Sequence, residues 1–310
     1  MRMTSDRNLI VIVGPTGSGK TDVAIEVAKR FGAPVVSADS RQFYKGMAIG
    51  TAQPTEDQLK EVKHYFIANL DIDRDYASGA YERDALELLE RLFADNNYVV
   101  LVGGSGLYVD ALCSGMDQMP EVNPELRVAI NLRYEQYGLE ALLKELRAVD
   151  PDFYEKVDRA NPKRVIRALE VYRQTGLPYS SFRQGVKQDR GFNIVKIGTD
   201  VPREQLYQRI NRRVDNMIED GLEDEAQMLY PHRHLNSLQT VGYREFFDYF
   251  DGKITREEAI ELIKRNSRRY AKRQMTWFGR DEDIRWMAPS ETAAIIGYIE
   301  ERTNTKPGKL

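Results

Sequence analysis

The chain has 310 residues, 42% hydrophobic and 30% charged, with a net charge of −3. This balance is typical of a folded globular protein and argues against a disordered one. There is no run of 18 apolar residues and no apolar signal core near the start, so we expect neither a membrane span nor secretion. Cys113 is the single cysteine, which excludes an internal disulfide and a cysteine-based zinc site. The cytoplasm is the expected compartment.

The net charge conceals two basic segments. One such run is often only a solvated helix face, but two runs in a mildly acidic chain favour a polyanionic partner. The basic residues of the first segment are Arg159, Lys163, Arg164, Arg167, Arg173, Arg183, Lys187 and Arg190, and those of the second are Lys264, Arg265, Arg268, Arg269, Lys272, Arg273 and Arg280.

The first part of the chain predicts strands that alternate with helices. Residues 8–13, 34–38 and 98–102 are short apolar runs rich in β-branched side chains, so each is predicted to be a buried strand. The spacing of apolar residues predicts helices over 21–31 and 81–93. This alternation predicts an α/β fold with a parallel sheet flanked by helices, in which ligands bind at the carboxyl ends of the strands.

The texture of the sequence changes between about Pro120 and Arg190. This stretch contains no buried β-branched run, and its helical patterns are rich in Leu, Tyr and Arg. We therefore predict a helical insertion domain at 120–190, within a core formed by 1–119 and 191–310. The predicted helices of the insertion are 124–137, 139–148 and 162–175. In the second part of the core a strand is predicted at 192–199 and helices at 203–220, 222–229 and 256–278, in a remainder interpreted as helical.

Residues Gly14–Thr21 fit the pattern G-x-x-x-x-G-K-[ST] between a predicted strand and a predicted helix. Glycines let backbone N–H groups turn towards phosphate oxygens, and the following helix directs its positive end at the anion. Lys20 supplies a mobile charge, and the Thr21 hydroxyl is placed for Mg²⁺. The residues expected to hold phosphate in this loop are Gly14, Thr16, Gly17, Ser18, Gly19, Lys20 and Thr21. The pattern predicts a P-loop.

The usual partners of a nucleotide-hydrolysing P-loop are missing. Such proteins place a carboxylate after an apolar strand to hold Mg²⁺, but the strand at 98–102 is followed by Gly103-Gly104-Ser105-Gly106. The base-reading motif Asn-Lys-x-Asp of regulatory GTPases is absent as well. The strand ends instead offer the Ser105 hydroxyl and the Asp39 carboxylate. This set favours a diphosphate held by two glycine-rich loops opposite a general base.

Asp39 has two interpretations. It could be the N-cap of a following helix, or it could act in chemistry, because Asp39-Ser40-Arg41-Gln42 places an acceptor, a hydroxyl, a guanidinium and an amide within four residues. Gln42 could pair with an adenine edge, as glutamine does in nucleic-acid recognition. The density of functional groups favours chemistry.

Five ordered motifs resemble the bacterial tRNA dimethylallyltransferases, also called tRNA isopentenyltransferases. They are Gly14–Thr21, Asp39–Tyr44, Gly103–Tyr108, Arg164–Glu170 and Ala271–Phe278, and the resemblance spans roughly Leu9 to Trp286. One departure is visible, since members of the family usually carry Thr where this chain has Ser105. The hydroxyl is kept, so we expect its role to survive.

The resemblance implies transfer of a dimethylallyl group from dimethylallyl diphosphate to the exocyclic amine of the adenosine on the 3′ side of the tRNA anticodon. It implies Mg²⁺ as the cofactor and a channel that donor and acceptor enter from opposite ends. Carried over motif by motif, Asp39 would be the general base, with Ser40 and Gln42 placing the adenine. Ser105 and an arginine would join the P-loop in holding the diphosphate, and Arg213 is favoured over Arg212.

The expected partners are dimethylallyl diphosphate and the tRNA anticodon stem-loop, bound by a monomer without membrane contact. The residues expected to contact tRNA are Asp39, Ser40, Arg41, Gln42, Ser105, Arg127, Lys163, Arg164, Arg167, Lys272 and Arg273. Three alternatives stay open: a P-loop kinase of small molecules or nucleotides that binds ATP, a non-catalytic RNA-binding P-loop protein, and an enzyme that prenylates free adenine nucleotides. Two basic segments favour tRNA, because a mononucleotide needs no such surface.

Overall fold

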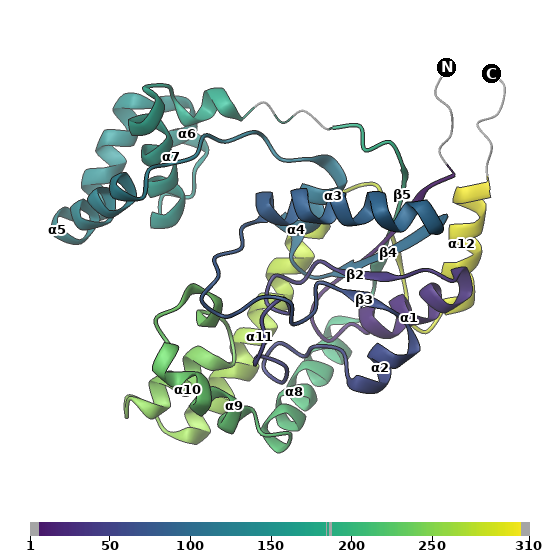
Figure 1. Ribbon diagram of the computed structural model, residues 1–310. Helices are drawn as coiled ribbons and strands as arrows, with labels where there is room; N and C mark the ends of the chain where they lie inside the picture. The colour runs from purple at the N-terminus through teal and green to yellow at the C-terminus, as the bar shows by residue number, and fades with distance from the viewer. Residues whose placement is uncertain (1–5, 184, 186–187, 305–310) are drawn as a thin grey trace. The chain divides into compact units, whose positions relative to one another are not determined.

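The strands form one parallel sheet in the computed structural model, which describes residues 6–183, 185 and 188–304 (Figure 1). Lys187 of the first basic segment lies outside the described residues. The strand order is β3-β2-β4-β1-β5-β6. The bounds are β1 (Asn8–Val13), β2 (Val35–Ser37), β3 (His64–Tyr65), β4 (Tyr98–Gly103), β5 (Asn193–Thr199) and β6 (Ile284–Met287). The predicted α/β class with a parallel sheet is confirmed.

The edge strands were not predicted. β3 has only two residues, too few for any periodicity in the sequence to register. β6 falls in a region interpreted as wholly helical, and that interpretation is wrong: its Ile-Arg-Trp-Met sequence pairs in parallel with β5.

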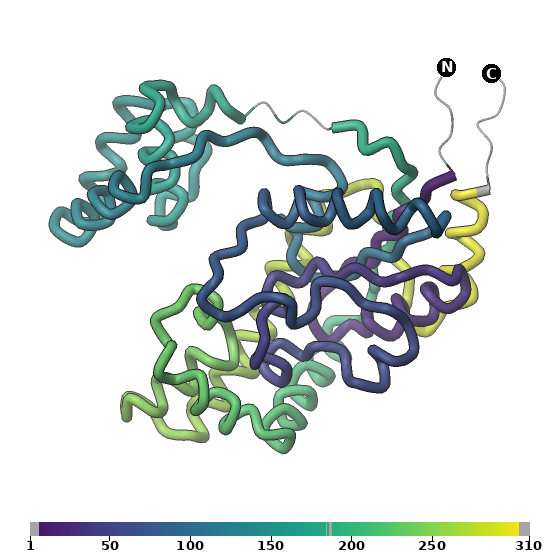
Figure 2. Tube along the Cα trace, viewed as in Figure 1, coloured from purple at the N-terminus to yellow at the C-terminus, as the bar shows by residue number. Residues whose placement is uncertain are grey.

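Helices cover both faces of the sheet, because neighbouring residues of a strand point to opposite faces. Ile10 and Ile12 of β1 pack in one apolar cluster with α1 (Lys20–Phe31) and α12 (Thr292–Asn304), which lie side by side (Figure 2). Leu9 and Val11 pack on the other face with α3 (Ser78–Asp95) and α4 (Gly106–Ser114). The central strand is therefore buried on both faces, as its continuous apolar sequence requires.

Within the described residues, the core formed by Met1–Ser114 and Asp189–Leu310 contains five further helices, and all of them except α2 contribute residues to the wall of the site. They are α2 (Glu56–Glu61), α8 (Arg203–Glu219), α9 (Leu222–Leu229), α10 (Tyr243–Phe250) and α11 (Arg256–Phe278), with short 3₁₀ turns at Tyr230–His232 and Asn236–Leu238. The start of α11 is fixed by a capping box, in which the Thr255 hydroxyl accepts from the Glu258 N–H at 3.2 Å and the Glu258 carboxylate accepts from the Thr255 N–H at 2.8 Å. Its end follows Phe278, as predicted.

Residues Gly115–Gln188 form a compact unit of their own, here called the insertion unit. It contains α5 (Pro124–Val149), α6 (Pro151–Lys156), α7 (Pro162–Thr175) and a 3₁₀ turn at Tyr179–Phe182. Its boundaries differ slightly from the predicted 120–190. Gly138 interrupts α5 with φ 72° and ψ −179°, between the two helices expected there. A separate apolar core that includes Ile130, Leu142 and Leu169 holds these helices together.

Within the described part of the chain, no helix combines the length and the apolar character that a membrane crossing demands.

Candidate active site

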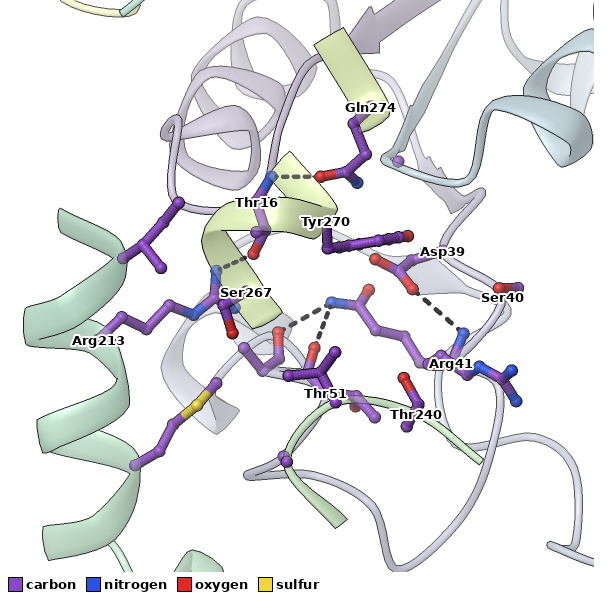
Figure 3. A pocket seen from close by; sticks show the side chains of 18 of the residues that line it. Thr16, Asp39, Ser40, Arg41, Thr51, Arg213, Thr240, Ser267, Tyr270 and Gln274 are labelled. Atoms are coloured by element: carbon purple, nitrogen blue, oxygen red, sulfur yellow. Dashed lines mark hydrogen bonds between the residues drawn. The ribbon is translucent and has the colours of Figure 1, made fainter. Parts of the chain in front are cut away.

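A cavity of about 570 Å³ opens at the carboxyl ends of β1, β2 and β4. The loops that follow these strands contribute the P-loop, the segment Asp39–Gln42 and Gly103 to its lining. Helices α8 and α11 supply the opposite wall, and Figure 3 shows Arg213 and Tyr270 reaching in from that side. Residues that are far apart in the sequence thus converge at the carboxyl ends of β1 and its neighbouring strands, where parallel sheets bind ligands.

The P-loop has the backbone of an anion-binding turn. Gly17 (φ 80°) and Gly19 (φ 88°) are in the left-handed region, which a residue with a Cβ adopts only with strain. Gly19 directly precedes α1, so the N-terminal end of that helix faces the cavity. Ser18 was expected to hold phosphate, but its buried hydroxyl braces the loop, donating to the Pro15 carbonyl at 2.8 Å and pairing with the Thr199 hydroxyl at 2.6 Å.

Lys20 lies in this loop, and its ammonium forms no ion pair with any residue that the structure describes. Its Nζ donates to the Pro15 carbonyl at 2.9 Å. Burial lowers the pKa of Lys20 to about 8, an effect that the charge of Asp39 partly offsets and that of Arg213 reinforces. A partly buried ammonium that donates to one carbonyl has much to gain from an anion. The geometry therefore favours a polyanionic ligand beside Lys20.

Arg213 projects from α8 into the same cavity, whereas Arg212 is exposed. The Arg213 guanidinium donates to the Thr16 hydroxyl at 3.2 Å (Figure 3). Burial lowers its pKa, and the charge of Asp39 acts in the opposite direction. Of the two arginines considered from the sequence, the favoured one, Arg213, faces the P-loop.

Asp39 lines the cavity from the loop after β2. Its Oδ1 accepts from the Arg41 N–H at 3.1 Å, which closes a tight turn. No helix starts here, and the next one, α2, begins at Glu56. The N-cap alternative is therefore wrong. Arg41 points away from this contact, donating to the carbonyls of Asn236 and Ser237 at 2.9 and 3.0 Å.

Two residues expected to touch substrate are engaged within the protein. The Ser105 hydroxyl accepts from the Ser40 N–H at 2.9 Å and donates to the Ser40 hydroxyl at 3.0 Å, so it holds the Asp39 loop and does not open into the cavity. The Gln42 amide donates to the Ala52 carbonyl at 2.8 Å and accepts from the Ser37 hydroxyl at 3.2 Å. Both ends of the Gln42 amide are in use, which fixes the segment around Ala52 (φ 48°) at the cavity edge.

The glycines of the second loop are required by packing. A Cβ on Gly103 would lie 2.4 Å from the Ala38 carbonyl carbon and oxygen, and one on Gly106 would lie 2.2 Å from the Trp277 ring. A Cβ on Gly104 would lie 2.2 Å from the Gln274 amide nitrogen. Helix α11 and the loop after β2 therefore approach too closely for any side chain. Packing alone therefore requires glycine at these positions, and the interpretation of Gly103–Gly106 as a second phosphate cradle stays a prediction.

Gln274 and Tyr270 on α11 were not assigned roles from the sequence. The buried Gln274 amide accepts from the Thr16 N–H at 2.8 Å and donates to the Gly104 carbonyl at 2.9 Å, so it joins the two glycine-rich loops. Tyr270 is hydrogen-bonded to Ser105, and burial followed by the charge of Asp39 raises its pKa to about 12. The sequence feature that could have identified Gln274 is its polar side chain at an inward-facing position of an otherwise basic helix.

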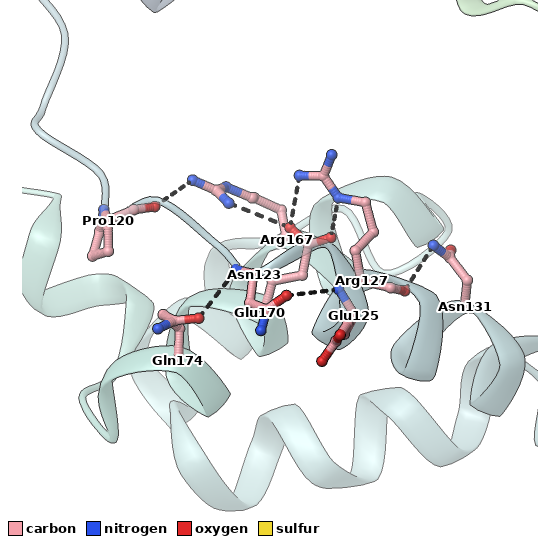
Figure 4. Close-up of polar contacts among 8 residues, drawn as sticks. All are labelled: Pro120, Asn123, Glu125, Arg127, Asn131, Arg167, Glu170 and Gln174. Carbon is pink, nitrogen blue, oxygen red and sulfur yellow. Dashed lines mark hydrogen bonds and ion pairs between the residues drawn. The ribbon is translucent and has the colours of Figure 1, made fainter.

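The basic residues expected to contact tRNA fall into two groups. In the insertion unit, Arg127 and Arg167 both bind the buried Glu170 carboxylate, at 2.7 and 3.3 Å (Figure 4). Lys163 and Arg164 at the start of α7 are exposed and form no ion pair with any residue that the structure describes.

On α11, Lys272 and Arg273 are exposed, and Arg273 also borders the cavity, with its guanidinium carbon 5.7 Å from the centre of the Tyr270 ring. Arg269 of the second basic segment borders the cavity too, and so does Arg244, which was not named from the sequence.

Magnesium fits this donor set only with help from a ligand. Among the described residues, no three His, Cys, Asp or Glu side chains gather into a metal cluster. The cavity does present the Thr21 hydroxyl and the Asp39 carboxylate, both hard oxygen donors. Mg²⁺ is commonly bound by one or two protein oxygens together with substrate phosphates and water. The residues present are thus compatible with Mg²⁺ delivered by a diphosphate.

Comparison with known proteins agrees with this geometry. Residues 42–281 match the family model described as IPP transferase. The chain is 50% identical to a tRNA dimethylallyltransferase of Cytophaga hutchinsonii over 96% of its length and 98% of the relative. It is 52% identical to tRNA dimethylallyltransferase 1 of Bacteroides thetaiotaomicron, over 94% of each chain.

Solved structures show the same architecture. The full-length tRNA isopentenylpyrophosphate transferase of Bacillus halodurans aligns with a TM-score of 0.72 and 37% identity, covering 96% of this chain and 97% of the other. A eukaryotic dimethylallyltransferase solved acting on tRNA aligns with a TM-score of 0.82 over 98% of this chain and 81% of the other, and at 24% identity it supports the fold alone. The resemblance carried by the five sequence motifs is confirmed, and the chain belongs to the IPP transferase family.

Proposed function

We propose that this tRNA-prenylating enzyme uses the cavity between the P-loop and Asp39 as its reaction chamber. It transfers a dimethylallyl group from dimethylallyl diphosphate to the exocyclic amine of the adenosine next to the anticodon, on its 3′ side. The products are N6-isopentenyladenosine in tRNA and diphosphate. One observation carries the proposal: the desolvated cation of Lys20, which is placed to bind an anion, and the carboxylate of Asp39 line the same cavity.

The leaving group is stabilised by the P-loop side of the cavity. When the allylic C–O bond breaks, negative charge builds on the diphosphate and positive character on the allylic carbon. The P-loop N–H groups, Lys20 and Arg213 are already in place around the first charge. Such preorganised groups usually supply the largest single share of catalysis. Mg²⁺, held by Thr21 and the diphosphate, would neutralise further negative charge on the leaving group.

Asp39 acts on the acceptor. The exocyclic amine of adenine is a weak nucleophile because its lone pair is delocalised into the ring. A carboxylate that accepts the amine proton as the new bond forms typically contributes about 10²–10⁴-fold. The turn closed by the Arg41 N–H fixes one Asp39 oxygen and orients the carboxylate. Ser105, through Ser40, and Gln42, through Ala52, hold the loops around it.

The adenosine must leave its stack in the anticodon loop to enter the cavity. Lys163 and Arg164 of the insertion unit and Lys272 and Arg273 of α11 are exposed cations that would bind loop and stem phosphates, with salt-sensitive affinity. Arg127 and Arg167 would add to this set only by sharing their contact with Glu170. We infer a monomer acting in the cytoplasm.

A kinase remains the main rival, because it also uses a P-loop. It would need a carboxylate near the end of β4 for Mg²⁺, and β4 ends in Gly103. Incubation with labelled dimethylallyl diphosphate and unmodified tRNA, followed by nucleoside analysis, separates the two. Formation of N6-isopentenyladenosine supports the prenyl transfer, and phosphoryl transfer from ATP without use of the prenyl donor would refute it.

The base assignment is tested by Asp39→Asn. Asparagine keeps the oxygen that accepts from the Arg41 N–H, so the turn survives, but its amide cannot take a proton. We expect the single-turnover rate to fall about 10²-fold or more, while tRNA affinity stays within a factor of about two. Asp22→Asn, at an exposed position of α1, is the matched control and keeps full rate. A rate for Asp39→Asn above a tenth of wild type would refute the assignment.

A further inference from the structure

Thr199 ends β5 with a hydroxyl at a position where the strand pattern favours an apolar side chain. Alternate residues of a strand share a face, and Val195 and Ile197 of β5 pack in the apolar cluster that includes α1. Thr199 follows them on that face and is completely buried. A buried hydroxyl is unfavourable unless it is hydrogen-bonded. Its bonding partners therefore indicate what Thr199 does, although it does not line the cavity.

The Thr199 hydroxyl is bonded to the P-loop. Its Oγ1 lies 2.6 Å from the Ser18 Oγ and 3.2 Å from the Val13 carbonyl oxygen. The Ser18 hydroxyl donates its single proton to the Pro15 carbonyl at 2.8 Å. The proton in the 2.6 Å contact is therefore that of Thr199. The chain of donors ends on the Pro15 carbonyl, which also accepts from Lys20 at 2.9 Å.

This hydrogen bond brings β5 and the P-loop closer than apolar side chains could come. Hydrogen-bonded hydroxyls lie about 2.5–3.0 Å apart, whereas non-bonded contacts of carbon atoms are best near 3.5–4.0 Å. The neighbouring Gly14 shows how little room there is, because a Cβ on it would lie 2.2 Å from the Thr199 Oγ1. A valine at position 199 would keep the volume but exchange this oxygen for a methyl group. The methyl group would push Ser18 away by roughly 1 Å.

A second side chain from outside the loop holds the residue on the other side of Gly17. The Gln274 amide accepts from the Thr16 N–H at 2.8 Å (Figure 3). Gly17 (φ 80°) thus lies between Thr16, which is tied to α11, and Ser18, which is tied to β5. The turn that has to face an anion is therefore fixed at both of its ends. Such donors stabilise charge well only when they are already in place.

We propose that Thr199 is a positioning residue of the anion site. Its bond to Ser18 sets the distance between the P-loop and β5, and so the place where the N–H groups of the loop meet the diphosphate. The inference rests on the proposed function, since it takes the anion to be the diphosphate of the prenyl donor. Thr199 acts through Ser18 and touches no substrate. A misplacement of about 1 Å can lower the rate on the order of 10²-fold.

Three substitutions separate the hydroxyl of Thr199 from its volume. Thr199→Ser keeps the hydroxyl, Thr199→Ala removes it without filling the space, and Thr199→Val keeps the volume but places a methyl group at the contact. We expect the kcat/KM for dimethylallyl diphosphate to stay within about twofold of wild type in Thr199→Ser and to fall at least about 10-fold in Thr199→Val, with Thr199→Ala between them. A role in packing alone gives the opposite order, because valine has the shape of threonine and serine leaves a void.

Binding of inorganic diphosphate gives a readout that does not depend on the chemical step. Its inhibition constant against the prenyl donor should rise in Thr199→Val about as much as the donor kcat/KM falls, while the KM for tRNA stays at the wild-type value. Thr303→Val on α12 is the matched control. It removes a hydroxyl that donates to the Ile299 carbonyl at 2.8 Å and does not line the cavity. All three constants should be unchanged in this control.

The outcomes that would overturn the inference are distinct from those that bear on the reaction. Wild-type donor kcat/KM and diphosphate inhibition in Thr199→Val would overturn it, and so would a Thr199→Ser variant impaired as much as Thr199→Val. Thermal unfolding shows whether each variant is folded, and if Thr199→Val does not fold, equal donor kcat/KM in Thr199→Ser and Thr199→Ala would overturn it. A wild-type enzyme that diphosphate does not inhibit would instead contradict the proposed function.

Discussion

The two glycine-rich loops of the core unit look alike in sequence but serve different purposes. In Gly14–Thr21 the glycines at positions 17 and 19 adopt left-handed backbone angles, which an anion-binding turn requires. In Gly103–Gly106 the glycines have no unusual φ, and a Cβ at Gly103, Gly104 or Gly106 would collide with a neighbouring segment. The first loop needs glycine for its conformation and the second for its neighbours.

This difference indicates that the first loop serves catalysis and the second serves the stability of the fold. The P-loop holds a partly buried, poorly compensated ammonium at Lys20, which costs stability until an anion binds. The second loop is clamped by Gln274 and by Trp277, whose indole N–H donates to Asp110 at 2.9 Å. Substitutions in the first loop should therefore impair activity, and substitutions in the second should impair folding.

The largest effect should come from Lys20→Met. Loss of one preorganised charge at a developing anion typically lowers the rate roughly 10²–10³-fold, and we expect such a fall in kcat/KM for the prenyl donor. The thermal midpoint of the ligand-free protein should not fall, because a buried charge is removed. Lys29→Met, at an exposed position of α1, is the control for the loss of a lysine. A marked loss of thermal stability in Lys20→Met would contradict this division of roles.

Gly103→Ala should have the opposite profile. Its Cβ would meet backbone atoms of Ala38, which cannot move away as a side-chain end can. Overpacking of this kind costs about 1–3 kcal/mol or more, measurable by denaturant unfolding. Gly297→Ala on α12, where nothing lies within 4 Å of the added Cβ, serves as the matched control and should stabilise the helix. Equal stability of Gly103→Ala and the wild type would show that the second loop is not tightly clamped.

The pH dependence of donor capture should depend on Lys20. Because burial lowers the pKa of Lys20 to about 8, the side chain is charged below that pH and loses its charge as pH rises. The kcat/KM for the donor should therefore fall above pH 8, by roughly tenfold at pH 9 for a single ionisation. A bound diphosphate raises this pKa, so kcat should fall less. Lys20→Arg should remove the alkaline limb, and a limb that persists in this variant would have another origin.

The smallest effect is expected in a double-mutant cycle between Gly104 and Gln274. This cycle is also the sharpest test of the contact by which Gln274 joins the two glycine-rich loops. Gly104→Ala should push the Gln274 amide off both the Gly104 carbonyl and the Thr16 N–H. Gln274→Ala breaks the same two hydrogen bonds, so the double variant should lose about 1 kcal/mol less than the sum of the single losses. Unfolding free energies measure this coupling, together with the donor KM. Strict additivity would contradict the link between the loops.

Local patterns in the sequence predicted the parts of the site that local geometry determines. The P-loop, the central strands and the position of Asp39 follow from short motifs and from β-branched runs next to them. The sequence favoured Arg213 over Arg212 but could not decide the matter, because it depends on which face of α8 packs on the P-loop. Gln274 escaped notice because its partner, Thr16, is 258 residues away.

The ion pair of Arg127 with Glu170 was equally invisible to sequence patterns because it joins α5 to α7, whereas the i,i+3 pair of Arg167 with Glu170 lies within α7 and was overlooked. Arg127 and Arg167 appeared to be available for phosphate until the structure placed both on Glu170, 43 and 3 residues away. The packing role of Gly103–Gly106 was missed for the same reason, since a collision with Trp277 exists only once α11 is packed.

The strand order has a consequence for how the protein is made. β1 is central, yet it emerges first from the ribosome, and its neighbours begin at Tyr98 and Asn193. Until β4 and β5 have been synthesised, both edges of this apolar strand stay unpaired in the nascent chain. Unpaired apolar edges favour aggregation and slow folding. We therefore expect dependence on chaperones during synthesis, and an assembled P-loop only after most of the chain has been translated.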